Sequence, residues 1–326
     1  MKRIVYILLA VLLVGCNIDQ NVVDMAQIRF DATVVSRDAL SQSNLESGKV
    51  FVCGVQNNSN TIFNNVAITR DATTGKWFSS TKRNWTEGSN YSFHAYAYNV
   101  SSGLTLSSGK DGLEFTIQQP STYNPDAMVD YLLSYSFKVA DGAMKPIVQL
   151  QLEHAMSLVE VYVVRGNMFD ARLTKMTFEN VYWQGTMKCT AQAVANSGAR
   201  NVWEVSPSGS NDVEYVYQPT TPAVIGDSRT NTAAKMMIMC LPQQLTAQTK
   251  LTIEYEVNEK VTPESPDNFV KHKEEFQLYN YQPINYQSGH RIVYTATVDS
   301  GVNLEGVISA WKDVDYIEGT VLPEIN

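Results

Sequence analysis

The four histidines are the side chains best suited to acid–base or metal chemistry, but their spacing supports neither. They are His94, His154, His272 and His290, and none forms a His-Glu-x-x-His or His-x-His pair or is followed by cysteines at zinc-site spacing. His154 is the most distinctive, because it interrupts an apolar stretch over residues 148–164. We interpret it as a structural histidine at a bulge or crossover, with a ligand or general base as the alternative.

Other patterns that support catalysis are also missing from the sequence. Asp313, Asp315 and Glu318 could contact a cation, but they lack the glycine and the spacing of a calcium loop. No nucleophile elbow, phosphate-binding loop or dinucleotide-binding glycine pattern occurs. The sequence therefore predicts a protein that is not an enzyme and needs no metal or cofactor.

The one cysteine placed for a covalent modification is Cys16. Lys2 and Arg3 precede an apolar run over residues 4–14 that ends well short of the roughly 20 residues needed to span a bilayer. Leu13-Val14-Gly15-Cys16 resembles the lipoprotein box of exported bacterial proteins, in which the cysteine thiol carries lipid and becomes the new N-terminus. Residues 1–15 are thus predicted to be a signal peptide and residues 16–26 a tether to the outer membrane; an ordinary signal peptide is the alternative.

Charge and cysteine content narrow the remaining classes. The formal net charge is −8 and no basic cluster is present, so nucleic acid is a poor partner. Cys53, Cys189 and Cys240 cannot all pair with one another, and the first and last lie in apolar segments. We expect buried free thiols there, with a disulfide framework or a reactive thiol as the alternative.

The pattern of apolar residues predicts an all-β protein. No segment keeps a helical stripe with caps over three turns, whereas period-two alternation recurs throughout the chain. Residues 27–36 form the first predicted strand, whose inward face carries Ile28, Phe30, Ala32 and Val34. Further strands are predicted at residues 49–56, 91–98, 113–117, 131–137, 146–152, 158–164, 213–217, 235–241, 250–257, 270–278, 290–298 and 304–311.

The length after processing suggests two domains, because single cores stop growing near 250–300 residues. Arg165-Gly166-Asn167 is the best boundary by composition. We therefore expect an N-terminal β-sandwich over residues 27–168 and a C-terminal β-sandwich over residues 169–326.

Four stretches together resemble the fimbrillin family, the pilus subunits and Mfa-like surface lipoproteins of Bacteroidales-type bacteria. They are Leu13 to Cys16, Trp85-x-x-Gly88-x-x-Tyr91-x-Phe93-x-Ala95-Tyr96, Asp130-Tyr131-Leu132-Leu133 running on to Val148-x-Leu150-x-Leu152-x-His154-Ala155-Met156-x-x-Val159-x-Val161, and Val307-x-x-x-Trp311. The resemblance implies two tandem transthyretin-like β-sandwiches in a surface lipoprotein that becomes a stalk, tip or anchor subunit of a fimbria and mediates adhesion.

The resemblance also implies how such a subunit assembles. An arginine-specific protease would cut the Arg37-Asp38 bond and release the strand that carries Ile28, Phe30, Ala32 and Val34. A strand from another fimbrial subunit would then fill the groove by β-strand addition. On this chain Ile317, Gly319 and Val321 alternate on the candidate donor strand near the C-terminus.

Besides a hydrolase accessory domain, two other interpretations stay open at this stage. Trp77, Trp85, Tyr91, Tyr96 and Tyr98 could line a sugar-binding face of a surface glycan-binding lipoprotein, although such residues more often lie in sandwich cores. A lipoprotein that faces inward from the outer membrane is the second alternative, because residues 17–20 give only a weak signal for surface export.

Overall fold

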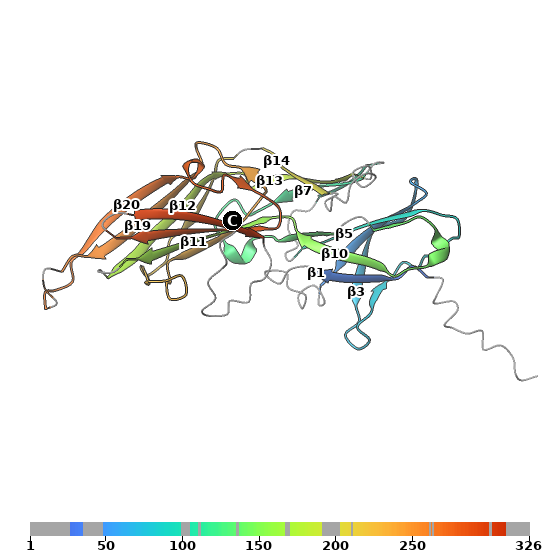
Figure 1. The fold of residues 1–326 in the computed structure, drawn as a ribbon, viewed down its shortest axis with the longest axis horizontal. Coiled ribbons are helices and arrows are strands. Elements are labelled where there is room, and N and C mark those ends of the chain that lie inside the picture. Colours follow the sequence, from blue (N-terminus) through green and yellow to red (C-terminus); the bar gives the residue numbers. More distant parts are fainter. Residues whose placement is uncertain are drawn as a thin grey trace, which may run out of the picture.

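The computed structural model describes residues 27–34, 48–98, 105–109, 112–134, 137–166, 170–190, 203–209, 211–260, 262, 264–299 and 302–310. These residues form strands joined by turns and short 3₁₀ helices, and this part of the chain contains no α-helix. The predicted all-β class is therefore confirmed. The strands form two lobes along the long axis, with the first lobe at the right of Figure 1 and the second at the left. The 3₁₀ helices are η1 (Pro125–Ala127), η2 (Gly142–Met144) and η4 (Leu278–Asn280).

The first lobe is a mixed sheet that closes on itself. Its strands follow the order β2-β3-β4-β1-β10-β8-β5-β9, and an additional pairing between β2 and β5 closes the sheet, with β9 beside β5. The buried side chains inside this closed sheet form an apolar core of their own. The strands are β1 (Phe30–Val34), β2 (Val50–Gln56), β3 (Asn60–Arg70), β4 (Trp77–Ser79), β5 (Tyr91–Tyr98), β8 (Tyr131–Ser134), β9 (Phe137–Val139) and β10 (Val148–His154).

Local sequence explains the strands and turns of this lobe. On β10, Val148, Leu150 and Leu152 are buried while the glutamines between them are exposed, because successive side chains of a strand point to opposite faces. Asn57 and Asn58 connect β2 to β3 with φ of 51° and 60°. Asparagine adopts this left-handed region more readily than most non-glycine residues, which explains the turn at this point.

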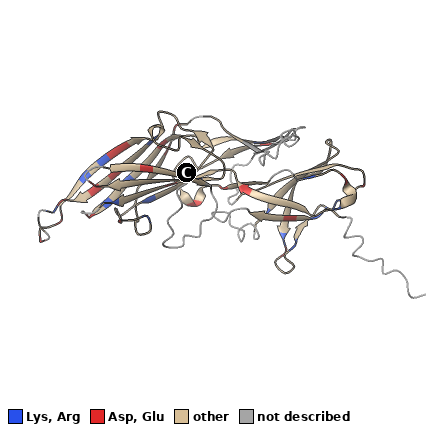
Figure 2. Ribbon diagram, in the orientation of Figure 1, with Lys and Arg blue, Asp and Glu red and all other residues tan. Residues whose placement is uncertain are grey.

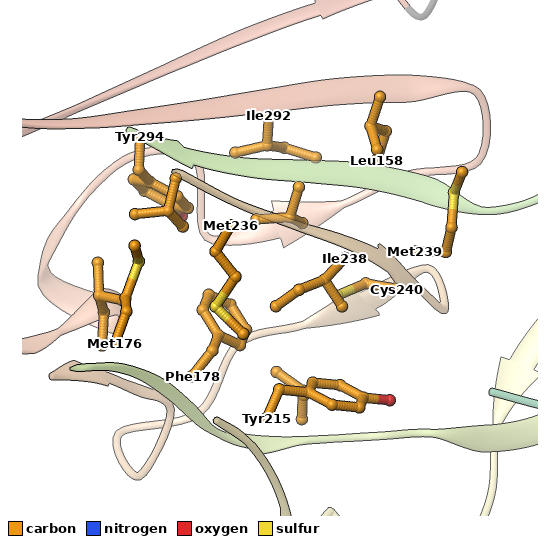
Figure 3. Close-up of a cluster of buried hydrophobic side chains, with 14 of the residues drawn as sticks. Leu158, Met176, Phe178, Tyr215, Met236, Ile238, Met239, Cys240, Ile292 and Tyr294 are labelled. Atoms are coloured by element: carbon orange, nitrogen blue, oxygen red, sulfur yellow. The ribbon is translucent and has the colours of Figure 1, made fainter. Parts of the chain in front are cut away.

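The second lobe is a β-sandwich. One sheet has the order β17-β11-β22-β23, and the other has the order β15-β12-β19-β20 with β16 beside β12. Figure 3 shows Met176, Phe178 and Tyr215 of one sheet pointing toward Met236 and Ile238 of the other. Cys240 is buried in the same core. The strands are β11 (Ser157–Arg165), β12 (Ala171–Val181), β15 (Val213–Tyr217), β16 (Ala223–Val224), β17 (Lys235–Cys240), β19 (Lys250–Asn258), β20 (Phe269–Gln277), β22 (His290–Val298) and β23 (Val302–Ala310).

A third sheet combines strands from the two halves of the sequence. Its order is β14-β13-β7-β6, and β7 pairs with β13 from Gly112↔Thr190 to Gln118↔Gln184. Ile117 and Met187, which belong to these two strands, are both buried in the core of the second lobe. The strands are β6 (Thr105–Gly109), β7 (Gly112–Gln118), β13 (Gln184–Thr190) and β14 (Trp203–Pro207), and a separate pair joins β18 (Gln243–Gln244) to β21 (Asn285–Tyr286).

The change from one lobe to the next differs from the predicted boundary at residue 168. β11 pairs with β17 and β22, so it belongs to the second sandwich although the sequence places it in the N-terminal half. The chain changes sheet between β10 and β11, at Ala155 and Met156. The local pattern did not reveal this, because β10 and β11 are both apolar strands and differ only in their partners.

Charged residues are interspersed on the edge of the second lobe formed by β19 and β20 (Figure 2). Lys250 lies 3.0 Å from Glu179 of β12, and Lys273 lies 2.7 Å from Glu275. Among the described strands β20 pairs with β19 alone, so it forms the edge of this sheet. Lysine and glutamate on such an edge discourage pairing with another chain.

Candidate functional site at the first strand

The first strand occupies a central place in the first lobe. β1 runs parallel to β10 over its whole length, from Phe30↔Val148 to Val34↔Leu152. On its other side Phe30 pairs with Trp77 of β4. Because β4 is short, β1 is held mainly by β10 and by the side chains that it buries.

Backbone contacts extend the attachment of β1 toward its start. The Val148 N–H donates to the Arg29 carbonyl oxygen at 2.8 Å, and the Ile28 N–H donates to the Arg83 carbonyl oxygen at 2.8 Å. An isolated bridge joins Gln27 to Asn84. Removal of the strand would therefore leave partner groups on both sides without their hydrogen bonds.

The side chains of this segment alternate as the sequence predicts. Ile28, Phe30 and Ala32 are buried in the core of the first lobe, and Val34 is half-buried at the end of the strand. Arg29 is exposed on the opposite face. The buried side chains thus fill a slot between β4 and β10.

Aromatic rings form the deepest part of this slot. The Phe30 ring lies edge-on to Phe63 with centroids 5.2 Å apart and edge-on to Phe93 at 5.8 Å. Trp85 in turn packs edge-on to Phe93 at 5.9 Å. Such edge-to-face pairs contribute beyond the area that they bury.

The aromatic residues considered for a sugar-binding face lie mostly in this interior. Trp77, Trp85 and Tyr91 are buried in the core of the first lobe. Tyr96 is buried beside the second core, and Tyr98 is partly buried against it. These five residues therefore do not form an exposed aromatic platform.

The histidines are separated in the structure. His94 is buried on β5, and His154 is the buried last residue of β10. His272 and His290 lie on β20 and β22. Among the described residues, no three histidine, cysteine or carboxylate side chains are placed to hold a metal ion.

The structure links His154 to a residue that the sequence did not pair with it. The His154 Nδ1 lies 2.9 Å from the Asp130 Oδ1, and both side chains are buried. Asp130 and His154 belong to the same stretch of those that resemble the fimbrillin family, which was the only signal for their proximity. Trp77 and Val148, which flank Phe30, were likewise not recognised as the walls of a slot.

Several predicted site residues lie outside the described residues. They are Cys16, Arg37, Asp38, Ile317, Gly319 and Val321. Within the described part of the chain, no helix has the length and apolar character needed to cross a membrane.

Comparison with known proteins places this geometry in a family. A structure of a candidate cell adhesion protein from Bacteroides uniformis is similar with a TM-score of 0.56 and 14% identity, over 88% of this chain and 99% of that chain. A candidate cell adhesion protein from Bacteroides ovatus gives 0.51 and 14%, over 88% of this chain and 98% of that chain. These likenesses show a shared fold, and no curated protein matches the chain. A family model described as fimbrillin-like matches residues 39–311, so the chain belongs to the fimbrillin-like family.

Proposed function

We propose that this protein is a structural subunit of a cell-surface fimbria, exported as an outer-membrane lipoprotein and assembled by exchange of its first strand. The observation that carries the proposal is the central place of β1 between β4 and β10. A strand that is removed from this position leaves unpaired backbone groups and an open apolar slot, and both are restored by an incoming strand.

The proposal assigns a direction and a pattern to the incoming strand. In the place of β1 it runs parallel to β10 and presents a large, a small and a branched side chain where Phe30, Ala32 and Val34 lie. Ile317, Gly319 and Val321 follow this order at the same spacing. A contact of this kind between successive copies repeats head to tail and gives an open filament.

Cleavage at the Arg37-Asp38 bond would release β1. The test is trypsin treatment of the purified full-length precursor, followed by N-terminal sequencing and size-exclusion chromatography. We expect a new N-terminus at Asp38 together with multimers. Arg29→Ala is the matched control, because the Arg29 backbone is already paired with Val148 and a protease needs an accessible segment.

The outcomes separate the steps of the proposal. Arg37→Ala should abolish both the cut and the multimers, whereas Arg29→Ala should leave both unchanged. If the wild-type protein is cut at Arg37 and stays monomeric, strand exchange between copies of this chain is wrong. If multimers form, Ile317→Asp should be compared with Thr320→Asp. Only residue 317 belongs to the inward face of the proposed donor strand, so only Ile317→Asp should prevent them.

The lipid anchor is tested independently. Cys16→Ala should move the protein from the membrane fraction to the soluble fraction and abolish incorporation of labelled palmitate. Membrane association that is unchanged in this variant would contradict the lipoprotein assignment. Protease accessibility on intact cells then distinguishes the proposed surface location from an inward-facing one.

A further inference from the structure

The connection between the lobes passes through a fully buried segment. β10 ends at His154 in the first lobe, and β11 begins at Ser157 in the second (Figure 1). Ala155 and Met156 between them are buried, and so is Ser157. A buried crossing needs partners for its backbone groups, since water does not reach them.

A buried histidine–carboxylate pair stands at the start of this crossing. The His154 Nδ1 lies 2.9 Å from Oδ1 and 2.8 Å from Oδ2 of Asp130, and the two side chains are 1% and 0% exposed. The two groups are therefore within hydrogen-bonding distance of each other inside the protein. A buried pair of this kind adds little net stability, and its best-attested use is to fix one arrangement over another.

The crossing is held from both lobes. On the first side the Ala155 N–H donates to the Tyr131 carbonyl oxygen at 2.7 Å, next to Asp130. On the second side the Gly289 N–H donates to the Met156 carbonyl oxygen at 2.9 Å, and the Ser157 hydroxyl donates to the Gln287 carbonyl oxygen at 2.7 Å. The turn before β22 is therefore hydrogen-bonded to Met156 and Ser157.

Val129, the residue before Asp130, is held by a residue linked to the second half of the chain. The Gln119 side chain bonds both the N–H and the carbonyl oxygen of Val129, at 2.9 and 2.6 Å. The Gln119 N–H donates to the Trp183 carbonyl oxygen at 2.7 Å. Asp130 is thus positioned from the third sheet, while His154 is positioned by β10.

We propose that Asp130 and His154 form a latch that fixes the second sandwich on the first lobe, by holding the crossing segment against β8 and against the turn at residues 287–289. Both are positioning residues that act through the backbone of Ala155 and Met156. Breaking the pair loosens the joint and leaves the interior of each lobe intact. The latch is independent of strand exchange, since it exists with β1 in place.

Hydrogen–deuterium exchange of the full chain tests the latch. In Asp130→Asn and in His154→Gln we expect the peptides that contain the Ala155 and Gly289 amides to exchange at least about tenfold faster. Amides of the β12–β19 ladder, for example around Phe178↔Leu251, should keep their wild-type rates. Their protection also reports that each variant is folded.

A matched control is available on the surface. His272 lies 3.7 Å from Glu259, and both side chains are substantially exposed. His272→Gln makes the same substitution away from the joint and should leave the Ala155 and Gly289 peptides unchanged. Wild-type exchange at the joint in both latch variants would overturn the proposal. A uniform rise over both lobes would overturn it equally, because it reports general stability instead of a joint.

Discussion

Phe30 lies opposite Trp77 of β4 on one side and opposite Val148 of β10 on the other. Phe30 therefore pairs with both neighbouring strands through its backbone, while its ring packs against Phe63 and Phe93. The stability of the first lobe should depend strongly on this residue.

Phe30→Ala should lower the free energy of unfolding by about 3–5 kcal/mol, because it removes a buried ring and leaves a cavity next to Phe63 and Phe93. Urea denaturation measures the loss. Thr33→Ala on the same strand is the control, since Thr33 is exposed and its change should stay within about 0.5 kcal/mol. Equal effects of the two variants would contradict the assigned facing of β1.

His94 should make stability fall on acidification. Burial, with a contribution from Lys138, lowers the pKa of His94 from 6.5 to about 4. The unfolded chain then binds more protons than the folded one between these values, so stability is lost as pH falls from 6.5 to about 4, by on the order of 3 kcal/mol.

Denaturation at several pH values measures this effect. His94→Gln removes the titrating group and should flatten the slope in that window relative to wild type. His272→Gln, on the partly exposed His272, should leave the slope in place. A His94→Gln profile parallel to that of the wild type would show that another group is responsible.

The two described free thiols should be inert in the native state. Burial raises the pKa of Cys53 to about 11 and raises the pKa of Cys240 further above its ordinary value. The thiolate is the reactive form, so alkylation at pH 8 should be slow until the protein unfolds. Mass spectrometry in a Cys16→Ala, Cys189→Ser background measures the labelling, and rapid native modification would contradict the burial.

The charged edge of β20 should protect the second lobe from self-association. Replacing Lys273 and Glu275 together by valine should increase light scattering, because an uncharged sheet edge offers its free backbone groups to another chain. Replacing Lys175 and Glu254 together by valine is the control, because this ion pair lies on the inner strands β12 and β19 and its loss should not raise scattering. Equal scattering in both variants would show that the sheet edge is not the cause.

Sequence patterns predicted single strands well. Residues 213–217 and 290–298 form β15 and β22 with the predicted bounds, and the alternation of Ile28, Phe30 and Ala32 matches their burial. A period of two is a local property, because it follows from the geometry of an extended backbone. It is therefore visible without knowledge of the fold.

The pairing partners of these strands could not be predicted from the sequence. β7 pairs with β13 from the other half of the chain, and β11 joins the second sandwich, although neither strand differs in pattern from its neighbours. Likewise Asp130 and His154 are 24 positions apart, and only the pairing of β8 with β10 brings them together. Non-local pairing depends on packing in three dimensions, which one sequence does not encode as a local signal.

The pairing of β2 with β5 gives the first lobe the topology of a hoop. A closed sheet that loses one strand stays connected. Here β4 and β10 remain linked around the far side through β3, β2, β5 and β8. After β1 is removed, β4 and β10 would therefore keep their spacing. An incoming strand could therefore pair with β4 and β10 on its two sides without refolding of the lobe.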